Sequence, residues 1–164
     1  MAELTERREV VMRFLAEPTD INFGGKVHGG AVMKWIDQAG YACASLWSGR
    51  YCVTVYVGGI RFFQPIHIGH IVEVRAQLIY TGRTSMHIAV NVSSADPRSG
   101  EYRQTTHCVI VFVAVDETGN PVPVHGWEPN TEEDRSLQAY AVRLMELRKG
   151  IEEKIEPMVP GKVK

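Results

Sequence analysis

Residues 31–47 constrain the fold of this chain of 164 residues most strongly, because their apolar side chains recur at helical spacing. The recurring positions are Val32, Trp35, Ile36, Ala39 and Cys43. The other sides carry mainly alanines, and the strongly polar exceptions are Lys34, Asp37 and Gln38. A helix that is apolar on most sides is usually buried on most sides. We therefore expect one long, buried helix that begins at Ala31.

Four segments after this helix have the pattern of β-strands separated by short turns. They are residues 51–64, 71–80, 85–93 and 105–115. In 71–80, apolar residues alternate with Glu73, Arg75 and Gln77, which is typical of an antiparallel strand with one wet face. Segment 105–115 has the pattern of a strand buried on both faces. The expected core positions of the two middle strands are Val72, Val74, Ala76, Leu78, Tyr80, Met86, Ile88, Val90 and Val92.

The two ends of the chain add less regular features. Residues 8–15 could form a further strand or a helical turn, 18–30 form a loop, and 96–101 form a hairpin turn. Residues 131–156 predict an amphipathic helix that starts with a capping box of Thr131 and Asp134. Its apolar stripe should cover part of the sheet or a neighbouring subunit. This stripe consists of Leu137, Tyr140, Leu144, Leu147, Ile151 and Ile155.

Antiparallel strands packed against a helix make an α+β fold. We expect one domain over residues 1–130, followed by an amphipathic helix and tail over 131–164. A single central helix leaves strand edges and one sheet face uncovered, so homodimerisation through the sheet is expected.

Charge and cysteine content narrow the class of protein. The 18 Lys and Arg residues against 19 Asp and Glu argue against a nucleic-acid partner. Cys43, Cys52 and Cys108 form no CxxC pair and lie among apolar neighbours, which predicts packed free thiols in a reducing compartment. There is no apolar segment of signal-peptide or membrane-spanning length. The expectation is a cytoplasmic protein with no membrane partner.

A possible reaction site lies at the start of the expected helix. Gly29-Gly30 precede it directly, and glycine lets a ligand oxygen approach the unpaired backbone N–H groups there. Asp37 lies two helical turns beyond Gly30, about 10 Å along the axis on the same face. An oxyanion donor and a carboxylate base would then line one groove. Alternatively, the glycines allow tight packing, and Asp37 caps or pairs something locally.

Two segments of the sequence resemble a known family. They are PTDINFGGKVHGGAVMKWIDQAG (18–40) and VTVYVGGIRFFQPIHIGHIVEVRAQLIYTGRTS (53–85). From about Arg8 to Val115 the chain resembles the hotdog-fold acyl-CoA thioesterases of the cytosolic acyl-CoA hydrolase and YciA-like type. The resemblance implies a hotdog fold, in which an antiparallel sheet wraps around one long helix and sheets pair edge to edge in dimers. It further implies hydrolysis of acyl-CoA to fatty acid and CoA, and a hexamer built from dimers.

The same resemblance implies roles for individual residues. Asp37 would activate water or attack the thioester carbon directly, and Asn22 would orient the water or the carbonyl. The backbone N–H of Gly30, or of a neighbour, would hold the thioester oxygen. Thr54 would face the dimer cleft, so that residues from two chains could meet in one site. Arg83, Thr84 and Ser85 would handle CoA. Apart from the resemblance, the charges of Arg61 and Lys34 make them weaker phosphate candidates, although such residues are more often plain surface charges.

Histidines leave several alternatives open. His28 could polarise the carbonyl or act as an acid, since imidazole exchanges protons near neutral pH, but it could equally bond the loop backbone or a dimer partner. His67 and His70 form an H-x-x-H pair without further ligands in register, so no metal is expected. Thioester hydrolysis needs water, a base and an oxyanion site, so no cofactor is expected besides the CoA of the substrate.

Two rival functions remain. A hydratase or dehydratase acting on acyl thioesters would pair His28 with Asp37, and a non-catalytic acyl-CoA-binding protein would use the same pocket without turnover. The sequence has no G-x-S-x-G motif, which argues against a serine hydrolase.

Overall fold

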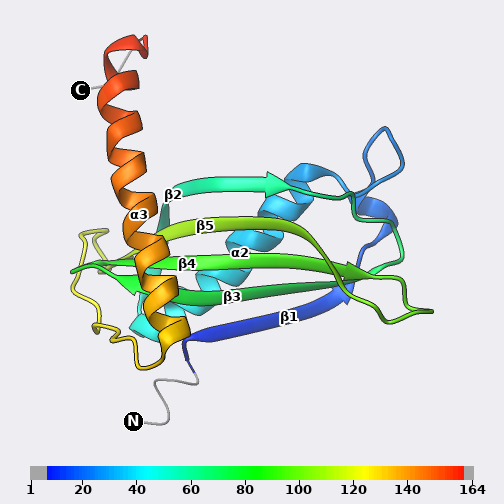
Figure 1. Cartoon of the computed structure of the whole chain (residues 1–164), viewed down its shortest axis with the longest axis horizontal. Coiled ribbons are helices and arrows are strands. Elements are labelled where there is room, and N and C mark those ends of the chain that lie inside the picture. The colour runs from blue at the N-terminus through cyan, green and yellow to red at the C-terminus, as the bar shows by residue number, and fades with distance from the viewer. Residues whose placement is uncertain (1–6, 161–164) are drawn as a thin grey trace. The chain divides into compact units, whose positions relative to one another are not determined.

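The computed structural model describes residues 7–160, and the chain divides into two compact units, Met1–Gly126 and Trp127–Lys164. The first unit holds one long helix and five strands (Figure 1). Its elements are β1 (Glu9–Leu15), the short 3₁₀ helix η1 (Pro18–Asp20), α2 (Gly29–Ser48), β2 (Tyr51–Phe62), β3 (Ile71–Thr81), β4 (Ser85–Ala95) and β5 (Arg103–Val115). In the segment 8–15, which the sequence left open, residues 9–15 therefore form a strand and Arg8 lies in the preceding turn.

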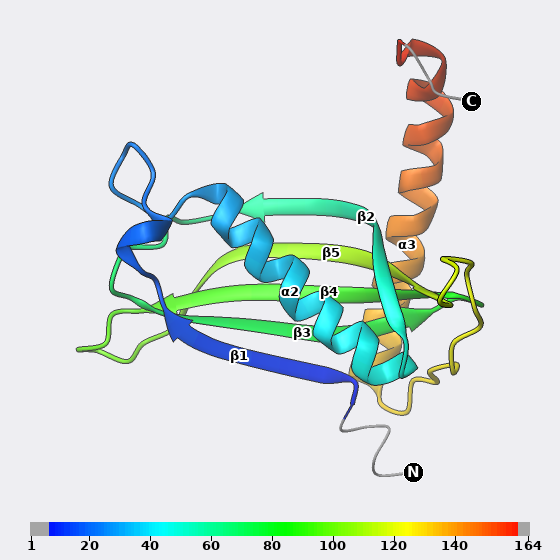
Figure 2. The ribbon, with the colours of Figure 1, turned by 180° about the vertical axis from the view of Figure 1, so that it is seen from behind.

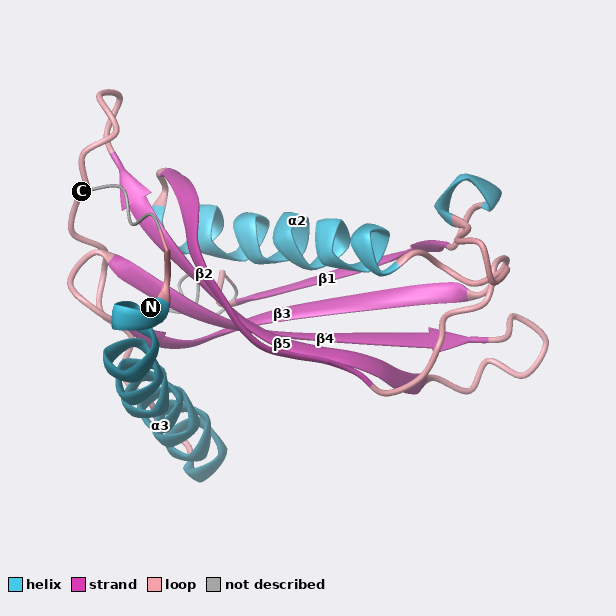
Figure 3. Cartoon of the chain, turned by 90° about the horizontal axis from the view of Figure 1, so that it is seen from above, coloured by secondary structure: helices cyan, strands magenta, loops and turns pink. Residues whose placement is uncertain are grey.

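The strands form a single antiparallel sheet in the order β1-β3-β4-β5-β2. The chain leaves β2 at one edge, passes the ends of β5 and β4, and enters β3 on the far side. Helix α2 contacts all five strands and lies along one face of the sheet (Figures 2 and 3). The predicted α+β architecture, with a sheet wrapped around one long helix, is confirmed.

Helix α2 differs from its prediction in its start and in its burial. It begins at Gly29, two residues earlier than expected, and its buried residues form one stripe. That stripe consists of Val32, Ile36, Ala39, Gly40, Cys43, Ala44 and Trp47. Met33, Tyr41 and Leu46 are 37–50% exposed. The expectation of burial on most sides is wrong for a single copy of the chain, because one sheet covers only one side of a helix.

Strands β3 and β4 follow the expected alternation over most of their length. All the predicted core positions except Tyr80 are completely buried. At Tyr80 the alternation fails, because the pairing of β3 with β4 shifts between Leu78 and Tyr80. This bulge leaves Ile79 fully buried and Tyr80 only half-buried. Strand β5 is buried on both faces for most of its length, as predicted.

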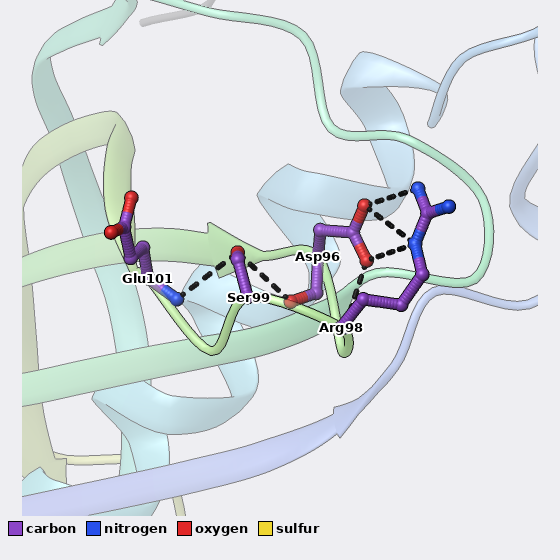
Figure 4. Close-up of polar contacts among 4 residues, drawn as sticks. All are labelled: Asp96, Arg98, Ser99 and Glu101. Carbon is purple, nitrogen blue, oxygen red and sulfur yellow. Dashed lines mark hydrogen bonds and ion pairs between the residues drawn. The ribbon is translucent and has the colours of Figure 1, made fainter.

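The hairpin loop between β4 and β5 is held by a local ion pair (Figure 4). The Arg98 guanidinium donates to both oxygens of Asp96, with the closest contact at 2.6 Å, and the Arg98 backbone N–H adds a bond of 2.9 Å. Ser99 Oγ donates to the Asp96 carbonyl and accepts from the Glu101 N–H. These bonds to Arg98 hold the pKa of the Asp96 carboxyl below its usual range.

The second unit contains α3 (Glu132–Ile155) and the short η2 (Glu156–Met158). The predicted capping box is confirmed, since Thr131 Oγ1 accepts from the Asp134 N–H at 3.0 Å and Asp134 Oδ2 accepts from the Thr131 N–H at 3.4 Å. What the apolar stripe of α3 covers stays a prediction. No helix within residues 7–160 is long and apolar enough to cross a membrane.

The three cysteines are free and buried, as predicted. Burial raises the pKa of the Cys43 thiol to about 12 and that of Cys108 to about 11, because a thiolate would lose its hydration in the core. Both thiols lie in the first unit, Cys43 on α2 and Cys108 on β5.

These pKa values predict that the folded protein loses stability as pH rises through 9 toward 11. The unfolded chain releases the two thiol protons from the ordinary value of 9.0 upward, whereas the native chain retains them to higher pH. Urea unfolding at pH 8 and pH 10.5 measures the difference. A Cys43→Ala/Cys108→Ala variant should show a shallower decline than the wild type, and an identical decline would contradict the prediction.

Candidate active site

The loop before α2 is a tight hairpin that fixes Asn22. Ile21 and Val27 pair across it, and Gly25 turns the chain with a φ of 79°. Asn22 Oδ1 accepts from the backbone N–H groups of Gly24 at 2.9 Å and Lys26 at 3.1 Å. Its Nδ2 has no acceptor among residues 7–160. The side-chain carbonyl therefore shapes the loop, while the amide N–H groups stay available to another partner.

His28 caps the N-terminus of α2. Its Nδ1 accepts from the Gly30 N–H at 2.9 Å, and its backbone carbonyl accepts from the Ala31 N–H at 2.9 Å. A Cβ at Gly30 would lie 3.0 Å from Nδ1, so a glycine leaves room for the ring. The imidazole thus occupies the Gly30 N–H, which the family resemblance assigns to the thioester oxygen. Of the alternatives for His28, bonding to the loop backbone is the one seen here.

Asp37 and Thr54 are joined by a short hydrogen bond. Thr54 Oγ1, on β2, donates to Asp37 Oδ1 at 2.6 Å, which is the length of a charge-assisted bond to a carboxylate. Asp37 is exposed in a single chain, and its bond to Thr54 is compatible with both alternatives that the sequence left open, a local pairing and a reacting carboxylate. The exposed side of α2 beside the edge strand β2 leaves room for solvent or a second copy.

Asp37 Oδ2 makes no hydrogen bond among residues 7–160. A carboxylate held through one oxygen, with the other open, can accept a proton from water. Asp37 and the Gly30 N–H lie about 10 Å apart along the axis of α2, which is seven residues at the usual rise. Asp37 and the Gly30 N–H therefore lie along the same side of the helix but do not contact one point in space.

The turn between β3 and β4 holds Arg83, Thr84 and Ser85. Ser85 pairs with Val113 of β5, which in turn pairs with Val53 of β2, directly beside Thr54. The turn is therefore two strand spacings from β2, about 10 Å, at the end of the sheet that carries Thr54. Arg83 is exposed there.

Arg61 lies toward the other end of the sheet. It pairs with His107, five residues along β5 from the partner of Thr54, which corresponds to about 17 Å. Its guanidinium stacks on the Phe63 ring at 5.4 Å from the centroid. A single copy therefore separates Arg61 from the turn at Arg83, although the sequence hypothesis grouped both around CoA.

A cavity of about 240 Å³ opens beside the first turn of α2, and sequence reasoning missed it. Most of its lining is apolar and comes from the loop before α2, from α2 itself and from the segment that ends β2. Thr106 of β5 contributes a polar side chain to the lining. The one sequence signal was a hydroxyl residue at a core position of a strand, which does not by itself predict a cavity.

The two histidines His67 and His70 lie with their ring centroids 5.0 Å apart, and Lys26 Nζ is 3.3 Å from His67 Nδ1. Desolvation and the neighbouring ammonium of Lys26 lower the pKa of His67. Across residues 7–160, no group of three or more histidine, cysteine or acidic side chains could hold a metal ion.

Known proteins resemble this chain in sequence. Residues 24–101 match the family model of the Thioesterase superfamily. The acyl-CoA thioester hydrolase YciA of Salmonella typhimurium is 33% identical over 123 residues, covering 73% of this chain and 92% of that protein. The protein VdlD of Helicobacter pylori is 32% identical over 146 residues, covering 89% of this chain and 83% of that one.

Solved structures resemble it in fold. An acyl-CoA hydrolase from Bacillus cereus is 31% identical with a TM-score of 0.85, covering 95% of this chain and 97% of its own. A hexameric acyl-CoA thioesterase is 34% identical with a TM-score of 0.84, covering 88% and 93%. The acyl-CoA hydrolase of Staphylococcus aureus, solved with butyryl-CoA and CoA, is 25% identical with a TM-score of 0.84, covering 96% and 94%. Together these matches identify the chain as a hotdog-fold member of the Thioesterase superfamily, related to the YciA-like acyl-CoA thioester hydrolases.

Proposed function

We propose that the chain hydrolyses acyl-CoA thioesters to a carboxylic acid and CoA, with Asp37 as the reacting carboxylate. The observation that carries the proposal is the 2.6 Å bond from Thr54 Oγ1 to Asp37 Oδ1, in a chain of this family. It fixes the carboxylate through one oxygen and leaves the other open. As a base, Asp37 Oδ2 takes a proton from water while the water oxygen bonds to the thioester carbon. The alternative, direct attack by Asp37, stays open.

The charge that develops on the thioester oxygen needs a donor, and we assign this role to the Gly30 N–H. That N–H is bonded to His28 Nδ1 in the free chain, so an entering carbonyl oxygen must displace the imidazole. The open Nδ2 of Asn22 supports its proposed role in orienting the water or the carbonyl. Collapse of the intermediate breaks the C–S bond and expels the CoA thiolate, which takes up the proton that Asp37 removed from water. The reaction requires no cofactor beyond the CoA of the substrate.

Variants of the S. aureus hydrolase support this choice of residues. Structures of that protein include single replacements by alanine of an asparagine, an aspartate and a threonine. In its numbering the aspartate lies 15 residues after the asparagine and 17 before the threonine. Asn22, Asp37 and Thr54 have the same spacing in this chain.

The hydrolase proposal is tested by incubating the protein with acyl-CoAs of several chain lengths and a thiol-trapping dye. Release of one thiol per substrate is expected. A hydratase or dehydratase would alter an enoyl- or hydroxyacyl-CoA without freeing a thiol, and a non-catalytic binder would do neither. Absence of thiol release from every acyl-CoA would overturn the proposal.

We assign CoA binding to Arg83, Thr84 and Ser85, with Arg61 as the weaker candidate. Arg83→Ala should raise KM for acyl-CoA by about tenfold, because a charge-assisted bond to phosphate is lost. For a short thioester that lacks the nucleotide, KM should not change. Steady-state kinetics on both substrates measures the difference. Arg98→Ala is the control, since that arginine pairs with Asp96, and equal effects of Arg83→Ala on both substrates would contradict the assignment.

Assembly through β2 follows from its position and its surface. This 12-residue edge strand carries exposed Tyr51, Val55, Val57 and Phe62. Pairing with β2 of a second copy would cover these side chains and bring the exposed Asp37 face of α2 next to another chain. We propose a homodimer on this edge. Three of the related structures are hexameric, which supports a trimer of such dimers. The cytoplasmic location expected from the sequence stays a prediction.

A further inference from the structure

One of the residues that line the cavity beside the start of α2, Thr106, has a hydroxyl without a hydrogen-bond partner in the described part of the chain. Thr106 is 1% exposed, and among residues 7–160 its Oγ1 has no hydrogen-bond partner. The neighbouring Thr105 is equally buried, but its Oγ1 donates to the Val92 carbonyl at 3.1 Å. Buried hydroxyls without partners are uncommon in folded proteins, since each costs free energy. Elsewhere among the described residues, Ser45 Oγ on α2 is likewise buried without a partner, but Thr106 is the one of the two that lines the cavity.

Thr106 lies on the face of β5 that is turned toward α2. Side chains alternate along a strand, and Ile110 and Phe112, four and six residues further on, lie so close to α2 that a Cβ at Gly40 would meet both within 3.0 Å. Thr106 shares their parity and also lines the cavity. Its side chain is thus on the helix side of the sheet, next to the apolar residues of the lining.

The cavity is placed to receive what is attached to the reacting carbonyl. Gly29 and Val32 of α2 line it, and Gly29 is adjacent to the Gly30 N–H proposed as the oxyanion donor. At its other side, the Phe62 ring lies near Gly29, where a Cβ would be 3.9 Å from Cζ. A volume of about 240 Å³ holds about eight non-hydrogen atoms, at about 30 Å³ for each water-sized group. That is the size of a short acyl chain.

We infer that this cavity binds the acyl chain and that Thr106 Oγ1 hydrogen-bonds an oxygen substituent on it, which makes short hydroxy- or keto-acyl thioesters the preferred substrates. The inference rests on the proposed hydrolase function. An unsubstituted chain fills the apolar lining but leaves the hydroxyl unpaired. A substituted chain satisfies it, and a site built around a buried polar group discriminates against the analogue that lacks the partner.

The test compares hexanoyl-CoA with 3-hydroxyhexanoyl-CoA and 5-hydroxyhexanoyl-CoA, which carry the oxygen near to and far from the carbonyl. For the wild type, kcat/KM should favour at least one hydroxylated substrate by about tenfold. Thr106→Val removes the hydroxyl at nearly constant shape and should reduce this ratio to about one. Thr106→Ser keeps a hydroxyl and should retain most of the preference.

Thr105→Val is the matched control, because it removes a neighbouring hydroxyl that is already paired with the Val92 carbonyl and does not line the cavity. It should lower the melting temperature and leave the substrate ratio unchanged, whereas Thr106→Val should not lower the melting temperature. A wild-type ratio near one, or a ratio that survives Thr106→Val, overturns the inference while the hydrolase function stands. Failure to release thiol from all three substrates overturns the hydrolase function itself.

Discussion

Asp37→Asn is expected to lower kcat by a factor of about 10² to 10⁴, the usual contribution of a positioned general base. The amide keeps an oxygen that can accept from Thr54 Oγ1, so the local geometry should persist while the capacity to take a proton is lost. Because Asp37 is exposed in the single chain, the melting temperature should change little. Steady-state thiol release and thermal unfolding on the same preparation measure both quantities.

Gln38→Ala is the control for this experiment, since Gln38 is the next residue on α2 and is also exposed. It should retain wild-type turnover. Thr54→Val should slow turnover less than Asp37→Asn, because it leaves the carboxylate present but unheld. Adding Thr54→Val to Asp37→Asn should cost almost nothing further, as expected for residues that act as a unit. Full activity of Asp37→Asn would remove Asp37 from the mechanism, whereas additive losses in the double variant would show that Thr54 does not act through Asp37.

Gly30→Ala is expected to reduce kcat by about 10² to 10³, the effect of losing one oxyanion donor, because the added methyl group blocks the substrate oxygen from the N–H that alanine retains. The new Cβ would lie 3.0 Å from His28 Nδ1 and 3.3 Å from its Cε1, in the space through which a carbonyl oxygen must approach. Alanine favours a helix more than glycine does, so α2 itself should still form. The expected result is therefore a folded protein with low turnover, which circular dichroism and thiol release together detect.

His28→Ala separates the two uses of the Gly30 N–H. If the imidazole serves as a cap alone, its loss should lower stability by about 0.5–2 kcal/mol and leave turnover intact, because the donor is free for substrate. If the imidazole also takes part in the reaction, kcat falls as well.

Gly126→Ala is the control for Gly30→Ala, since a Cβ at Gly126 meets nothing within 4 Å. Normal turnover of Gly30→Ala would show that another N–H holds the oxygen.

Local patterns in the sequence predicted most of the elements of this fold. The spacing of Val32, Ile36 and Cys43 marks α2, and the alternation through Val72 and Val74 marks β3, because burial on one side imposes the period of each element. Which strands pair with each other in the sheet could not be predicted from such patterns. Nothing local indicates that β2 joins β5 rather than β3, which follows it in the chain, since strand order depends on long-range packing. The bulge at Ile79 could not be predicted either, because one extra residue in a strand leaves the apolar composition of the segment unchanged.

The candidate site was predictable to the level of residue type. A lone carboxylate on an apolar helix and glycines at the helix start are unusual enough to draw attention from sequence alone. Their exposure and hydrogen bonds are not encoded so directly. That Asp37 is open to solvent, that His28 covers the Gly30 N–H, and that Thr106 has no partner all depend on side-chain directions in the folded chain.

The Asp37–Thr54 bond joins two consecutive elements of the chain. Seventeen residues separate its partners, and the reversal between them is made at Gly49, which ends α2 in a left-handed conformation with a φ of 64°. Contacts this local form quickly, whereas pairing β1 with β3 has to close a loop of about sixty residues. During folding, the helix–strand unit that aims the carboxylate can assemble before the sheet closes around it. Inserting residues into the two-residue connection of Gly49 and Arg50 should therefore lower turnover at insertion lengths that still leave the sheet folded.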